Sequence, residues 1–144
     1  MAEALLALDV GQARIGVAGG RTGSALVFGR GVVPGRKQRD AIAEIRRLAE
    51  AEGARRVVVG LPTRHDGGDS TQTQRVRAFA VALEAAGLEV AFEDERFTSQ
   101  LAERRLQSSA TGRSERRDKG RIDEAAAILI LESYLARLGA EGAP

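Results

Sequence analysis

The sequence predicts an α/β fold in which helices flank a five-stranded mixed sheet, with three strands in an antiparallel meander and two parallel strands. Apolar runs of strand length follow one another closely near the N-terminus, which is typical of a meander. Further along, short apolar runs alternate with amphipathic segments, which is typical of right-handed β-α-β crossovers. The length of 144 residues suits one domain. We expect that domain over residues 1–138 and a flexible tail over 139–144.

The meander is predicted from three apolar segments in the first 34 residues. Residues 4–8 are all apolar, which indicates a strand buried on both faces. Gly11 permits a tight turn, after which residues 15–18 return as the second strand of a hairpin. Residues 25–33 follow as a third strand interrupted by glycines.

The middle of the chain alternates helical and strand patterns. Apolar side chains recur at helical spacing in two segments; a fully apolar run follows the first, and a mostly apolar run that contains Glu89 follows the second. Ser70 and Thr71 are both suitable N-caps for the second helix. The expected elements are a helix over 36–52, a strand over 57–59, a helix from Ser70 or Thr71 to about Gly87, and a strand over 88–92.

Two helices and a polar connection are predicted for the C-terminal third. Thr98 or Ser99 can cap a helix that ends near Leu106. Residues 107–120 are polar and basic without an apolar period, so we expect a mobile loop there. A long helix with apolar side chains on most of its faces is expected from Asp123 to about Leu138.

Composition excludes several classes of function. The chain has no cysteine, so disulfides and thiolate metal sites are excluded. No apolar run approaches the roughly 18 residues of a membrane span, and the N-terminus has no signal-peptide pattern. We therefore expect a cytoplasmic protein without a membrane partner.

Positive charge is concentrated in one segment. Residues 104–121 hold seven basic and two acidic residues, a local charge of +5, which leaves −3 for the rest of a chain whose total is +2. Such a segment is typical of a phosphate-rich partner, although solvated arginines are also common on surfaces. Aromatic residues make up only 3% of the chain, so a nucleic acid would be held mainly by its backbone.

Acidic residues stand at the ends of three predicted elements. Asp9 follows the first strand, residues 93–95 follow the last strand, and Asp123 begins the final helix. Functional sites of α/β sheets gather beyond strand ends, so these carboxylates are expected to converge. A carboxylate cluster suits Mg²⁺ or Mn²⁺, and two such ions can hold the attacking and leaving oxygens of a phosphodiester.

Each acidic position also has a purely structural interpretation. Asp9 can serve as a turn residue, Asp123 as a helix cap, and residues 93–95 as an exposed strand exit paired with Arg96. His65, in a glycine-rich loop, can assist proton transfer or simply be solvated.

Four sequence blocks resemble those of the YqgF/RuvX family, over nearly the whole chain and in the same order. The blocks are Leu8–Gly11 with Arg14–Ala18, Val58–Pro62, Asp94–Ser99, and Ile122–Ala126 with Ile128 and Leu129. The resemblance implies a ribonuclease H-like fold related to the RuvC resolvases. It also implies a bacterial nuclease with roles in 5′-end maturation of pre-16S rRNA and in resolution of branched DNA such as Holliday junctions.

The resemblance places the family acids on Asp9, on the Asp94–Glu95 pair and on Asp123. Strand alternation sends Glu95 and Asp94 to opposite faces, and we favour Glu95 as the ligand. Many family members have a further acidic residue shortly after the position of Ala18, where this chain has Gly19-Gly20-Arg21. The predicted catalytic and metal-binding residues are therefore Asp9, Glu95 and Asp123, with Mg²⁺ or Mn²⁺ as two ions. The predicted nucleic-acid-binding residues are Arg14, Arg96, Arg113, Arg116, Arg117, Lys119 and Arg121.

Two other functions stay open at this point. A nucleic-acid-binding protein without catalysis would explain the basic segment but not the acids beside it. An actin-like ATPase also begins with an Asp-x-Gly strand turn, but it needs two such domains to enclose a nucleotide. Composition and spacing leave open RNA or DNA as substrate, endonuclease or exonuclease action, and a monomer or a homodimer.

Overall fold

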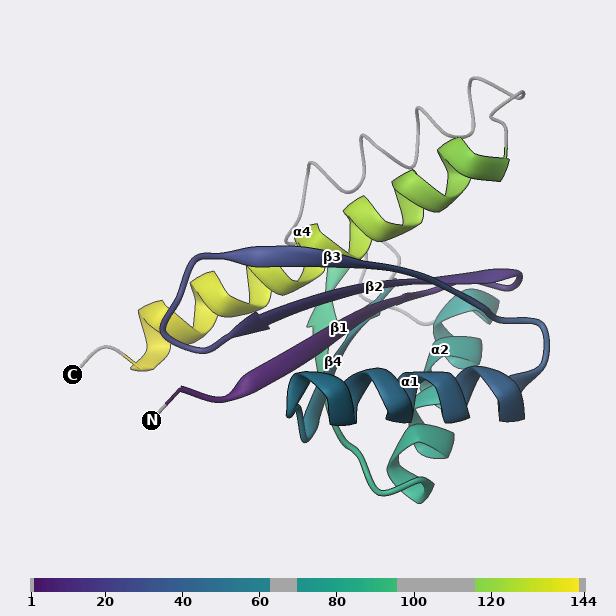
Figure 1. Cartoon of the computed structure of the whole chain (residues 1–144), viewed down its shortest axis with the longest axis horizontal. Coiled ribbons are helices and arrows are strands. Elements are labelled where there is room, and N and C mark those ends of the chain that lie inside the picture. The colour runs from purple at the N-terminus through teal and green to yellow at the C-terminus, as the bar shows by residue number, and fades with distance from the viewer. Residues whose placement is uncertain (1, 63–69, 96–115, 143–144) are drawn as a thin grey trace.

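The computed structural model describes residues 2–62, 70–95 and 116–142 of the chain (Figure 1). The elements in chain order are β1 (Ala4–Val10), β2 (Arg14–Arg21), β3 (Val27–Pro34), α1 (Gln38–Glu52), β4 (Arg56–Leu61), α2 (Thr71–Ala85), β5 (Glu89–Asp94) and α4 (Arg116–Gly142). Among these described residues, no helix is long and apolar enough to cross a membrane.

The strands form one five-stranded sheet in the order β3-β2-β1-β4-β5. The first three strands pair antiparallel, β4 pairs parallel with β1, and β5 pairs parallel with β4. The predicted mixed sheet, a meander extended by two parallel strands, is therefore confirmed. α2 leads from β4 to its parallel neighbour β5, whereas α1 leads from the edge strand β3 past β2 and β1 to β4.

Helices cover both faces of the sheet. Figure 1 shows α4 running along one face, with α1 and α2 on the opposite face. Because strand side chains alternate, Leu6 and Leu8 of β1 face α1 and α2, whereas Leu5 and Ala7 pack with α4. We call these two sides of the sheet the α1/α2 face and the α4 face.

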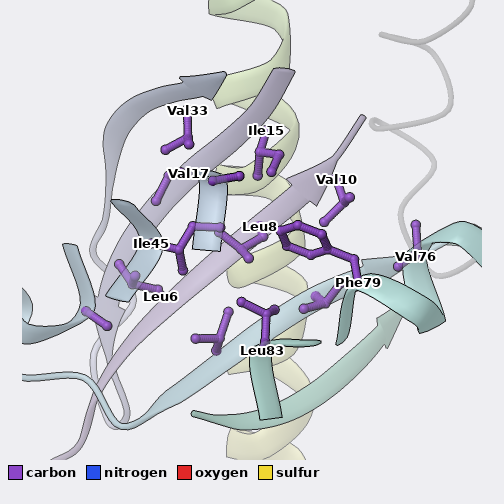
Figure 2. Close-up of a cluster of buried hydrophobic side chains, with 14 of the residues drawn as sticks. Leu6, Leu8, Val10, Ile15, Val17, Val33, Ile45, Val76, Phe79 and Leu83 are labelled. Atoms are coloured by element: carbon purple, nitrogen blue, oxygen red, sulfur yellow. The ribbon is translucent and has the colours of Figure 1, made fainter. Parts of the chain in front are cut away.

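The larger core fills the α1/α2 face. Figure 2 shows its side chains converging between the sheet and the two helices. Its members are apolar residues at alternate strand positions and at helical spacing on α1 and α2, and they include Leu6, Leu8, Val57, Val59, Ile45, Val76, Phe79 and Leu83.

Most element boundaries agree with the predicted pattern within a few residues. Ser70 is the N-cap of α2, accepting a hydrogen bond from the Thr73 amide at 3.1 Å. Gly53 ends α1 in the left-handed conformation, with φ of 73°. β3 is continuous through its glycines, and β5 extends to Asp94 rather than Phe92.

The start and end of α4 correct the sequence prediction. Residues 116–120, predicted as part of a mobile loop, are helical, and so are residues 139–142 of the predicted tail. Arginine and lysine are good helix formers, and a helix anchored by downstream packing extends through such residues without an apolar period. The predicted helix from Thr98 to Leu106 and the loop residues 107–115 lie outside the described residues.

Glycines on β2 allow α4 to approach the sheet very closely. A methyl group added at Gly16 would overlap the backbone carbonyl of Asp123. By contrast, a methyl group at Gly19 of the same strand would meet nothing nearer than the Arg30 side chain at 3.4 Å. Gly16 therefore decides how near the helix backbone lies to the sheet.

Replacing Gly16 by alanine is expected to lower the free energy of unfolding by about 2 kcal/mol or more, because a backbone carbonyl cannot move aside as a side chain can. Gly19→Ala is the matched control, with an expected change of less than about 1 kcal/mol because its new methyl group makes ordinary contacts. Urea unfolding of both variants measures the difference. Equal stabilities would show that the contact between α4 and β2 is not tight.

Candidate active site on the α4 face

Asp9 lies inside β1 rather than in the turn that follows the strand. Its side chain is buried, with the residue only 6% exposed, on the same face as Leu5 and Ala7. In the antiparallel ladder it lies opposite Gly16 of β2. A buried carboxylate is costly unless it meets a cation or hydrogen-bond donors, so Asp9 needs such a partner in the fold.

Asp123 reaches the same region from α4. Its backbone carbonyl lies over Gly16, the ladder partner of Asp9, so the two acidic residues belong to neighbouring segments. Asp123 lies seven positions after the first residue of α4, about two turns into the helix. This placement rules out the helix-cap interpretation and corrects the expectation that Asp123 begins the helix.

The Asp123 carboxylate is paired with Arg14. The Nε atom of Arg14 donates a hydrogen bond to Oδ2 of Asp123 at 2.7 Å, and the two side chains are 36% and 22% exposed. Arg14 is the first residue of β2 and was predicted to bind nucleic acid. In the structure its Nε atom contacts Asp123, and its role in binding nucleic acid stays a prediction.

Glu95 and Asp94 point to opposite sides of the sheet. Ala91 of β5 packs with the α4 core and Val90 with the other core, so odd-numbered positions of this strand belong to the α4 face. Glu95 comes directly after β5, and its Oε1 lies 3.2 Å from a methyl group built on Gly60. Gly60 is one residue beyond the Leu8–Val59 pair and thus lies beside Asp9.

Glu93 is a structural residue that ties β5 to α4. It is fully buried, and its carboxylate accepts hydrogen bonds from Ser133 and from Arg137, whose Nη2 is 2.6 Å from Oε1. The sequence pattern did not reveal this role. Ser133 and Arg137 are four residues apart on one helix face, a spacing that lets both reach a single strand residue.

Glu124, in the N-terminal half of α4, anchors this helix to the edge strand β3. Its Oε2 accepts a hydrogen bond from the backbone amide of Gly31 at 2.6 Å. Gly29 makes room for this carboxylate, since a methyl group there would overlap it. The contact at Glu124 and the contact at Glu93 together fix where α4 presents Asp123.

Histidine and acidic side chains do not gather into a metal-binding group of three anywhere in the described parts of the chain. The three predicted ligands, Asp9, Glu95 and Asp123, share the α4 face, but the Asp123 carboxylate is engaged by Arg14. The carboxylates are therefore near one another in the fold without being assembled into a coordination shell.

Some of the remaining residues that were predicted to bind nucleic acid lie in α4, and the others lie outside the described residues. Arg121 is exposed on α4, next to the segment that carries Asp123. Arg116, Arg117 and Lys119 belong to the first turns of this helix. Arg96, Arg113 and His65 lie outside the described residues.

Comparison with solved structures identifies the fold. The chain aligns with RuvC from Thermus thermophilus in complex with a Holliday junction substrate, with a TM-score of 0.54 and 16% identity over 95% of this chain and 96% of that chain. The same score is found for a second structure of Thermus thermophilus RuvC. The sheet and helices thus have the ribonuclease H-like arrangement of RuvC.

Comparison with curated sequences identifies the family. A Thermus thermophilus protein named "Putative pre-16S rRNA nuclease" is 44% identical over 131 residues, 91% of this chain and 96% of that protein. Ribonuclease YqgF of Deinococcus radiodurans is 42% identical over 135 residues, 92% of this chain and 88% of that protein. The sequence model described as "RuvX: Holliday junction resolvase" matches residues 3–137. The chain therefore belongs to the RuvX family.

Proposed function

We propose that this protein is a nuclease that hydrolyses phosphodiester bonds in structured nucleic acid with the help of divalent metal ions. The observation that carries the proposal is the contact at Gly16, which brings Asp123 of α4 beside the buried Asp9 of β1. Glu95 completes the set from the end of β5, on the same face of the sheet. Membership in the RuvX family supports the same reaction.

The 5′ end of pre-16S rRNA is the proposed substrate, with branched DNA as a second candidate. Relatives of this chain carry names that refer to pre-16S rRNA, and the family model refers to Holliday junctions. Both substrates offer a phosphate backbone, which suits a chain with few aromatic residues for stacking on bases. Parallel assays on labelled RNA and on four-way junctions distinguish them.

The residues present suit Mg²⁺ or Mn²⁺ in their chemistry. Asp9, Glu95 and Asp123 offer only carboxylate oxygens, the donors that these hard cations prefer. Two bound ions would stabilise the charge on the attacking and leaving oxygens of the phosphodiester. The three side chains would hold the ions, and Arg14 contacts one oxygen of the Asp123 carboxylate.

The protein itself contributes rigidity and desolvation. Asp9 projects from a strand that is paired on both sides, and Asp123 from a helix that Glu93 and Glu124 fix against the sheet. Side chains held in this way lose little conformational freedom when they bind a ligand. Basic residues at the start of α4 would hold the nucleic-acid backbone near the same end of the helix.

Asp9→Asn is expected to lower the cleavage rate at least about a hundredfold while leaving nucleic-acid binding intact, because an amide cannot supply the negative charge that the cations need. Rates on labelled RNA and on four-way junctions with Mn²⁺ or Mg²⁺ measure the first effect, and a gel-shift assay measures the second. Excess chelator is the control, and it should abolish cleavage by the unmodified protein. Cleavage by Asp9→Asn at the unmodified rate would remove Asp9 from the site.

Glu95→Gln is expected to reduce cleavage as strongly as Asp9→Asn, whereas Asp94→Asn should have a mild effect. The reason is that the Glu95 side chain lies near Gly60 on the α4 face, whereas strand alternation directs Asp94 to the opposite face. The two variants change the charge equally and form a matched pair. If Asp94→Asn were the more damaging change, Asp94 rather than Glu95 would be the ligand.

Replacing Arg113, Arg116, Arg117 and Lys119 by serine is expected to weaken binding to all sequences and to flatten its salt dependence. If each residue contacts one phosphate of duplex DNA, the slope of log K against log salt should fall by about 0.9 per residue removed. Filter binding at several salt concentrations gives the slope. An unchanged slope would place the nucleic-acid contact elsewhere on the protein.

A further inference from the structure

Arg14 contacts the same carboxylate, that of Asp123, that a metal ion would bind. Its Nε donates to Oδ2 of Asp123 at 2.7 Å, a charge-assisted hydrogen bond between residues that are 109 positions apart in the sequence. A guanidinium at this distance neutralises the carboxylate and uses one of its two oxygens. A divalent cation bound to Asp123 would need the same negative charge.

The backbone holds both partners of this ion pair in place. Arg14 closes the β1–β2 turn, where its carbonyl accepts a hydrogen bond from the Gly11 amide at 3.0 Å. Two residues further along β2, Gly16 lies against the backbone of Asp123. Because the two backbones are fixed relative to each other, the pair loses less entropy on forming than two surface side chains on mobile segments would.

Arg14 also offsets repulsion between carboxylates. The buried Asp9 lies opposite Gly16 on the neighbouring strand, so a second negative charge from Asp123 enters a region that already holds one. Like charges in a partly buried site destabilise each other unless a cation lies nearby. Arg14 supplies a positive charge there from the protein itself.

We propose that Arg14 is a built-in counter-ion of Asp123 that competes with divalent metal ions for this carboxylate. This inference rests on the proposed function, because it takes Asp123 to be a metal ligand. A metal ion at Asp123 must then compete with the Arg14 guanidinium for the negative charge of this carboxylate.

The competition predicts that removing Arg14 strengthens metal binding. Arg14→Gln in the full chain should bind Mn²⁺ about three- to fivefold more tightly than the unmodified protein, the upper part of the range expected from loss of one partly exposed ion pair. Free Mn²⁺ measured by electron paramagnetic resonance during titration gives the affinity without any cleavage reaction. Arg14→Lys, which keeps a positive charge but loses the Nε donor, should lie between the two.

Arg21→Gln is the matched control, since Arg21 is exposed at the opposite end of β2 and the variant loses the same charge. Its Mn²⁺ affinity should stay within about twofold of the unmodified protein if long-range charge effects are screened. Melting curves without metal establish that each variant folds. If Arg14→Gln does not fold, Arg14→Lys carries the test.

Asp123→Asn separates failure of this inference from failure of the proposed function. If Asp123 is a metal ligand, combining Asp123→Asn with Arg14→Gln should abolish the gain in Mn²⁺ affinity. The counter-ion role alone would be overturned by two results together. Arg14→Gln would bind Mn²⁺ no more tightly than the unmodified protein, and Asp123→Asn would still weaken Mn²⁺ binding. Full Mn²⁺ affinity in Asp123→Asn would instead overturn both the metal-ligand assignment and the inference.

Discussion

The site depends on one close contact between backbones, that of α4 with β2 at Gly16. A side chain at this position would overlap the carbonyl of Asp123, so only glycine lets the helix lie this near the sheet. The contact brings an acidic residue of the last helix next to the ladder partner of Asp9, although the two acids are separated by most of the chain. Without it, Asp123 would not lie beside the pair of strands that carries Asp9.

Charge neutralisation on the α4 face follows from this packing. Glu93 is paired with Arg137, Asp123 with Arg14, and Glu124 with a backbone amide of β3. Each of these carboxylates is wholly or partly removed from water, and such a group is costly unless a donor or cation compensates it. The first and last contacts serve to hold the helix. The pair at Asp123 differs because it engages a carboxylate that the proposed chemistry requires.

Much of the fold could be predicted because its signals are local. Alternating and helical apolar patterns identified the strands and most helices, and the sheet has the predicted mixed topology. The start of α4 could not be predicted in this way. Residues 116–120 have no apolar period, and they are helical as an extension of a helix whose buried apolar residues include Ala126 and Ala127 further along.

The sequence by itself determined the type of fold, the family and the acidic residues worth testing, since strand and helix periods and short motifs are written in neighbouring residues. Only the tertiary structure decided that Arg14 pairs with Asp123 and that Glu93 and Glu124 anchor a helix. These relations join residues far apart in the chain, and no local pattern encodes them. They arise because glycines on the sheet let one long helix approach closely enough for its polar side chains to find partners there.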